Sequence, residues 1–138
     1  MNNSKETPRG IRNNNPLNIR IGNNWWGEVE NQTDTQFEQF KKMEYGIRAA
    51  FIILRRYIEK YGRNTVALII SSWAPSSENN TKAYIKFVCE KAQIPEDRII
   101  KYDDKDVMIR LVDAMIQYEC GQQVKEEKVQ CAYEIAHR

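Results

Sequence analysis

Apolar side chains recur at helical spacing through the last two thirds of the chain. In residues 43–62 they follow each other at intervals of three and four, and the segment closes on Gly62, which predicts an amphipathic helix. The apolar positions of this helix are Ile47, Ala50, Phe51, Leu54, Tyr57 and Ile58. The same period predicts helices in four further segments, residues 65–73, 79–93, 103–120 and 124–138.

Polar residues mark where these helices begin. Asn64 or Thr65 is placed to cap the second helix, and Asp103 or Asp104 is placed to cap the segment that ends before a glycine. Residues 94–100, IPEDRII, supply the proline and acids that are typical of a helix start, so we expect a short helix there as well.

The first third of the chain has no helical periodicity. Residues 1–9 are polar and predict a flexible tail, and NNNP followed by NIRIGNNWWG predicts alternating turns and short strands. A length of 138 residues fits one domain. We therefore expect a single domain over residues 10–138 that is mainly α, in an α+β arrangement. A small irregular β region in the N-terminal third would be followed by five or six helices.

Composition narrows the classes of function. No apolar run approaches the length of a membrane span, and the N-terminus lacks the apolar core of a secretory signal, so we expect synthesis in the cytoplasm and no membrane insertion. Three cysteines without C-x-x-C spacing and a single histidine argue against a metal site and favour reduced thiols. The net charge of +2 is far below that of a dedicated nucleic-acid-binding protein. Arg9, Arg12 and Arg20 make the N-terminus locally basic, which suits either an anionic polymer or simple solvation.

Carboxylates are the remaining candidates for chemistry. The sequence has no G-x-S-x-G elbow and no phosphate-binding glycine loop, and its only histidine, His137, lies next to the C-terminus. Glu44 and Glu78 are most simply acids at helix starts. Glu119 differs from both, because it lies in line with an apolar stripe in the last turn of a predicted helix.

The position of Glu119 suits a general acid. Burial against Met115 and Ile116 and the negative end of the helix dipole both raise the pKa of a carboxyl group. A raised pKa keeps the proton in place near neutral pH, as proton donation requires. Gly121 would let the chain leave in a left-handed turn and would leave space for a ligand. The alternative is that Glu119 is a solvated residue of the last helical turn.

Asparagine and tryptophan are concentrated in the predicted loops NNNPLN, NNWWG and SSWAPSSENN. Each asparagine offers two donors and an acceptor, and each indole offers a flat apolar face. Sugars bind to this mixture of groups. The alternative for any one tryptophan is ordinary core packing.

Four stretches together resemble a known family. RGIRNNNPLNIR, WWG, FEQFKKMEYGIRAAFIILRRY and TVALIISSWAPSSENNTKAYIKFV resemble a group of phage and prophage proteins in the lysozyme-like superfamily, often labelled virion structural proteins. More distantly, they are similar to bacterial glucosaminidases and lytic transglycosylases. The resemblance covers about residues 9–121. One departure is that those enzymes carry the catalytic glutamate on a helix before the asparagine-rich stretch, whereas here MIQYECG matches that helix on the C-terminal side.

The resemblance implies a circularly permuted lysozyme-like domain in which Glu119 protonates a glycosidic oxygen of peptidoglycan. Permutation is physically easy when the termini of a compact domain lie close together. The sugar-binding residues that it implies are Asn15, Asn18, Trp26 and Tyr84, and Trp73 and Glu78 of the loop SSWAPSSENN are further candidates. No second carboxylate is evident, which fits a substrate-assisted or lytic-transglycosylase route.

A non-catalytic virion structural or peptidoglycan-binding module with the same fold is the alternative function. A third hypothesis, nucleic-acid association through the basic N-terminus, is opposed by the low net charge. We expect the partner to be the peptidoglycan glycan strand, bound by a monomer without a cofactor and without nucleic acid. The expected place of action is the cell wall or a virion, after export or release.

Overall fold

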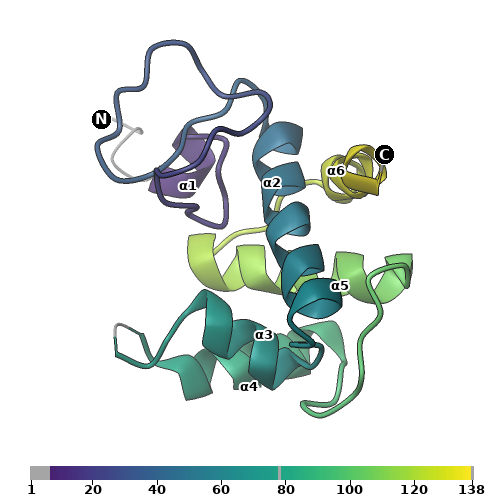
Figure 1. Cartoon of the computed structure of the whole chain (residues 1–138). Helices are drawn as coiled ribbons and strands as arrows, with labels where there is room; N and C mark the ends of the chain where they lie inside the picture. Colours follow the sequence, from purple (N-terminus) through teal and green to yellow (C-terminus); the bar gives the residue numbers. More distant parts are fainter. Residues whose placement is uncertain (1–6, 78, 138) are drawn as a thin grey trace.

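A computed structural model describes residues 7–77 and 79–137 of the chain. The fold in this range is mainly helical (Figure 1). Its elements in chain order are α1 (Arg9–Arg12), α2 (Met43–Arg55), the π-helical turn η2 (Arg56–Lys60), α3 (Val66–Trp73), α4 (Thr81–Ala92), α5 (Lys105–Cys120) and α6 (Glu126–His137). The five helices expected from the long periodic segments are confirmed. No helix in the described part of the chain is both long enough and apolar enough to span a membrane.

Capping side chains fix the helix ends close to the predicted positions. The Thr65 hydroxyl accepts a hydrogen bond from Leu68 N at 3.3 Å, which selects Thr65 over its neighbour as the cap of α3. Asp104 accepts from Val107 N at 3.3 Å and caps α5 in the same way. At the other end of α5, Gly121 adopts the left-handed conformation with φ of 70°, as the sequence predicts.

Helix α5 is the central element of the core. It packs against α1, α4 and α6, and Figure 1 shows α2 crossing it. Burial on several faces explains why its sequence is apolar beyond a single stripe, with Leu111, Val112, Met115 and Ile116 all fully buried. The last turn of α5 is therefore held between the N-terminal region and α4.

The N-terminal third differs from the predicted β region. The structure has no strand between residues 7 and 42, where only two isolated antiparallel bridges occur, Arg20 with Phe37 and Glu28 with Phe40. Scattered backbone hydrogen bonds, together with side-chain bonds to the backbone and to other side chains, hold this region together in place of a continuous ladder. The short alternating pattern of apolar and polar residues in this region therefore reflects a partly buried segment of irregular structure rather than strands.

Arg9 shows how this region is tied down. Its guanidinium donates to both carboxylate oxygens of Asp34, at 2.7 and 2.6 Å, and Asn13 donates to the same carboxylate at 2.9 Å. The Arg9 guanidinium holds the pKa of Asp34 well below its usual range. The polar pattern assigned Arg9 to the flexible tail, but it begins α1. Residues 1–6 of the predicted tail lie outside the described residues.

Residues 94–100 do not form the short helix that their composition predicts. Ile94 and Ile100 are both buried in the core, and Ile100 N donates to Asn64 O at 2.7 Å. Anchoring the two ends of the segment at separate points in the core requires turns, which overrides the local helix-start signal.

Candidate functional site

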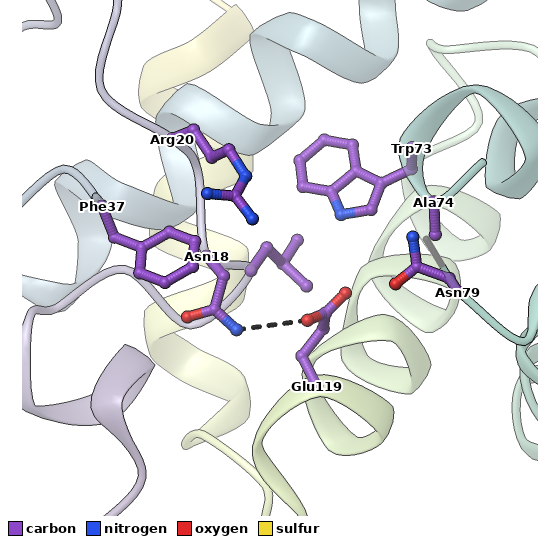
Figure 2. Close-up of a pocket in the computed structure, with 8 residues that line it drawn as sticks. Asn18, Arg20, Phe37, Trp73, Ala74, Asn79 and Glu119 are labelled. Carbon is purple, nitrogen blue, oxygen red and sulfur yellow. Dashed lines mark hydrogen bonds between the residues drawn. The ribbon is translucent and has the colours of Figure 1, made fainter. Parts of the chain in front are cut away.

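Glu119 lies in the last turn of α5 and points into a cavity (Figure 2). Its Oε1 accepts a hydrogen bond from Asn18 Nδ2 at 3.2 Å, and its Oε2 accepts one from the Tyr84 hydroxyl at 2.9 Å. The two donors, Asn18 and Tyr84, are 101 and 35 positions away from Glu119 in the sequence. Glu119 is thus half-buried and hydrogen-bonded, which differs from a fully solvated residue of a last helical turn.

Burial raises the pKa of the Glu119 carboxyl above its ordinary value. Hydrogen bonds from Tyr84, Asn18 and Trp73 act in the opposite direction, since they favour the ionised carboxylate. Burial outweighs these bonds, so the net direction is upward. This is the direction that the apolar surroundings of Glu119 in the sequence predict.

Tyr84 supports the carboxylate from α4 rather than lining the cavity. It is 2% exposed, and its ring stacks on Tyr118 with centroids 4.0 Å apart. Burial, and after it the neighbouring Glu119, raises the pKa of Tyr84 far above its ordinary value, so its hydroxyl keeps its proton and remains a hydrogen-bond donor. The resemblance implies a sugar-binding role for Tyr84, whereas its contacts position the acid.

The cavity in front of Glu119 has a volume of about 260 Å³. It is lined by Leu17, Asn18, Arg20, Phe37, Trp73, Ala74, Asn79 and Glu119. Figure 2 shows Arg20 and Phe37 on one side and Trp73 and Asn79 on the other, with the Glu119 carboxylate between them. An indole face, two amides, a guanidinium and a carboxylate thus converge on one space.

Asn15, which the resemblance places in the cleft, is instead part of the scaffold. It is fully buried, and its Nδ2 donates to Ile19 O and Glu38 O, both at 2.9 Å, while its Oδ1 accepts from Ile19 N at 2.9 Å. Its backbone carbonyl also accepts from Asn18 N at 3.0 Å. Asn15 therefore fixes the loop that carries Asn18, but it is not among the residues that line the cavity.

This loop is also fastened to α2 and α5. Gly46 of α2 lies so close to Asn14 that a Cβ at position 46 would meet the Asn14 carbonyl oxygen at 1.9 Å. At the end of α5, the Cys120 thiol donates to Pro16 O at 3.1 Å. Cys120 forms no disulfide, and neither do the other two cysteines. These contacts bring Asn18 next to Glu119.

Arg20 and Phe37 belong to the cavity although neither was among the candidates from the sequence. They pair across one of the isolated bridges, and the Arg20 guanidinium carbon lies 5.0 Å from the centre of the Phe37 ring. The basic character of the N-terminus was the signal for Arg20, but solvation explained it equally well. Asn79 belongs to the asparagine-containing loop SSWAPSSENN but was not singled out, and Phe37 carried no comparable signal.

The remaining candidates are divided between the cavity and other places. Trp73 lines the cavity from the end of α3. Trp26 is 60% exposed and contacts Tyr45, with ring centroids 5.2 Å apart, and it is not among the residues that line the cavity. Glu78 lies outside the described residues.

One carboxylate is therefore available for chemistry in this cavity, as far as the described lining residues show. Glu119 is the only acid among them. The described part of the chain has no cluster of three or more histidine, cysteine, aspartate or glutamate side chains that could hold a metal ion. The arrangement can donate a proton from a partly desolvated acid to a ligand that presents hydroxyl and amide groups.

Comparison with known proteins places the chain among phage proteins. No protein-family profile matches it. Over 120 residues it is 45% identical to Protein P5 of Pseudoalteromonas phage PM2, an alignment that covers 84% of this chain and 73% of that protein. The chain belongs to the family of this phage protein.

Proposed function

We propose that the protein cleaves β-1,4-glycosidic bonds of bacterial peptidoglycan, with Glu119 as the general acid. The observation that carries this proposal is the half-buried Glu119 carboxyl, whose pKa is raised by burial, at the base of a cavity with an indole and two amides. Relationship to a phage protein supports a cell-wall substrate, since a phage meets peptidoglycan when it enters or leaves a bacterium.

In the first step, protonated Glu119 donates its proton to the glycosidic oxygen, and the bond between that oxygen and the anomeric carbon breaks. Positive charge develops on the sugar ring, and the Glu119 carboxylate that remains lies next to it. Tyr84 and Asn18 each donate to one carboxylate oxygen. These bonds hold the group in place and stabilise its newly ionised form.

The second step needs no further carboxylate from the protein. In one route the 6-hydroxyl of the substrate attacks the anomeric carbon and gives its proton to Glu119. In the other route the 2-acetamido oxygen bonds to the anomeric carbon, and water then attacks that carbon, breaks the new bond and gives its proton to Glu119. This scheme agrees with Glu119 being the only acid among the described lining residues. Trp73 offers an apolar face to a sugar ring, and Asn79 offers an amide.

We also propose that the fold is a circularly permuted lysozyme-like domain. The support is that α5, which follows the asparagine-rich loop by about a hundred residues, ends with Glu119 hydrogen-bonded to Asn18 of that loop. In the families that the sequence resembles, the glutamate helix comes directly before the loop.

The proposal is tested by zymography and turbidity assays on purified peptidoglycan with the wild-type protein and Glu119→Gln. The substitution keeps the size of the side chain but removes the ionisable proton, so activity should fall by about 10²–10⁴-fold. Glu90→Gln is the matched control, because the Glu90 side chain is exposed on α4, away from the cavity, and lies 3.9 Å from Lys86 in a long ion pair. It should retain full activity.

Two outcomes would contradict the proposal. Equal clearing by wild type and Glu119→Gln would remove Glu119 from the chemistry. No clearing by either protein, together with retained binding to peptidoglycan, would favour a non-catalytic binding module.

A further inference from the structure

Arg20 is a cation inside the cavity without a carboxylate of its own. Its guanidinium points into the same space as Glu119 and Trp73 (Figure 2). Among the described residues its guanidinium contacts the face of the Phe37 ring, and no hydrogen bond or ion pair satisfies its donors. A guanidinium offers five N–H donors in a planar fork that matches a carboxylate.

The surrounding structure keeps Arg20 in this position. The isolated bridge between Arg20 and Phe37 places the two side chains on the same face, as in a cross-strand pair. Backbone bonds on both sides of the bridge, Ile21 N to Gln36 O at 3.1 Å and Glu38 N to Ile19 O at 2.9 Å, fix this register. The backbone of Arg20 is thus fixed by the fold, while its side chain is exposed at the cavity and accessible to a ligand.

Among the described residues, no acid of the same region forms an ion pair with Arg20. The Asp34 carboxylate is occupied by the guanidinium of Arg9. The buried Glu38 lies beside Glu28 and is not among the residues that line the cavity. Glu119 accepts its bonds from Asn18 and Tyr84. When Glu119 carries its proton, the described lining of the cavity has one positive charge and no negative charge.

We propose that Arg20 binds a carboxylate carried by the glycan, so that the preferred substrate is an acidic amino-sugar chain rather than a neutral chitin-type chain. This inference rests on the proposed function of the same cavity and adds the substrate class. Paired donation from a guanidinium to a carboxylate gives both affinity and orientation. It would set the sugar that bears the acid in a fixed position relative to Glu119.

Peptidoglycan presents carboxylates from two sources. One is the stem peptide, and the other is the lactyl group of the muramic sugar once the peptide has been removed. The chemistry that Arg20 recognises is the same in both, and the test below separates them.

Binding is measured in the Glu119→Gln background, which prevents turnover, by the change in tryptophan fluorescence that is expected because Trp73 lines the cavity. The probes are chitohexaose, a peptidoglycan hexasaccharide with stem peptides, and the same hexasaccharide without them. Adding Arg20→Gln should raise the Kd for an acidic hexasaccharide about tenfold and change the Kd for chitohexaose by less than about twofold. The acidic probe that is affected identifies the source of the carboxylate.

Arg56→Gln is the matched control, because it removes the same charge from η2, away from the cavity. It should leave all three Kd values unchanged. Arg20→Lys keeps the charge but loses the paired donors, and it should retain part of the affinity for the acidic probe.

An equal effect of Arg20→Gln on all three probes, or no effect on any of them, would overturn the inference while leaving the proposed function intact. Absence of binding to every probe in the Glu119→Gln protein would overturn the proposed function and this inference with it.

Discussion

The hydroxyl of Tyr84 offers a direct test of how Glu119 keeps its proton. It donates to Glu119 Oε2 at 2.9 Å from a side chain that is 2% exposed. Tyr84→Phe removes this oxygen and keeps the ring that stacks on Tyr118. The substitution therefore changes one hydrogen bond to the carboxylate and little of the packing.

The bond favours the ionised form of Glu119, so its loss should raise the pKa of Glu119 further. A hydrogen bond to a charged group contributes about 1.5 kcal/mol at the lower end of its range, and about 1.4 kcal/mol corresponds to one pH unit. A general acid is active in its protonated form. The alkaline limb of kcat/KM against pH should therefore move to higher pH by about 1 in Tyr84→Phe.

Stability should change with pH in the same sense. Because the folded-state pKa of Glu119 is raised, its contribution to stability is present below the ordinary pKa of glutamate and is lost as pH rises through the folded-state pKa. Without the tyrosine hydroxyl this loss becomes larger. Tyr84→Phe should therefore have a lower free energy of unfolding than wild type. The difference between the two proteins should be about 1 kcal/mol larger at pH 8 than at pH 4.

The assays are kcat/KM on a soluble oligosaccharide between pH 4 and 9 and urea unfolding at the two pH values. Tyr118→Phe is the control, because it removes a phenolic oxygen from the adjacent ring, and Glu119 accepts its tyrosine hydrogen bond from Tyr84. The reasoning would be refuted if the alkaline limb of kcat/KM moved to lower pH in Tyr84→Phe. It would also be refuted if the limb moved equally in Tyr118→Phe.

Three further predictions test the scaffold. Asn15→Ala removes three buried hydrogen bonds and should lower the free energy of unfolding by about 3 kcal/mol in urea, whereas Asn79→Ala, at an exposed position, should cost below about 1 kcal/mol. Gly46→Ala forces a Cβ against a backbone oxygen and should lower the melting temperature by about 10 °C or more. Burial, and after it the neighbouring Glu28, raises the pKa of Glu38 to about 7, so wild type should lose stability from about pH 4.5 to pH 7. Glu38→Gln should flatten this dependence in thermal unfolding measured across that range, and an unchanged slope would contradict the assignment.

The five long helices were predictable because their signal is local and repeated, whereas the single turn of α1 carries no such repeat. Periodic apolar positions over 43–62, a threonine cap before α3 and a glycine after α5 each report a backbone preference within a few residues. The unusual setting of Glu119 was visible for the same reason, since its apolar neighbours lie one turn away on the same helix.

The asparagine-rich loop could not be divided into scaffold and site from the sequence. Asn15 and Asn18 have the same side chain three positions apart, and both suit a sugar ligand as well as a backbone carbonyl. What separates them is that the backbone carbonyls of Ile19 and Glu38 converge on Asn15, while Asn18 faces a helix end 101 positions away. These are tertiary contacts, which no local pattern reports.

Asn15 also holds in place the two residues of this region that would contact the ligand, Arg20 and Asn18. The bonds from Asn15 to the carbonyls of Ile19 and Glu38 flank the bridge that directs Arg20 into the cavity, and the Asn15 carbonyl holds Asn18. Glu119 is carried independently by α5, which is packed on several faces. Loosening the loop in Asn15→Ala should therefore weaken glycan binding through Arg20 and Asn18 together, while the burial that raises the pKa of Glu119 persists in large part. A fall in kcat/KM that comes mainly from a higher KM is the expected kinetic signature. Weakening of the Asn18 bond to Glu119 should also move the alkaline limb to higher pH, in the same direction as in Tyr84→Phe.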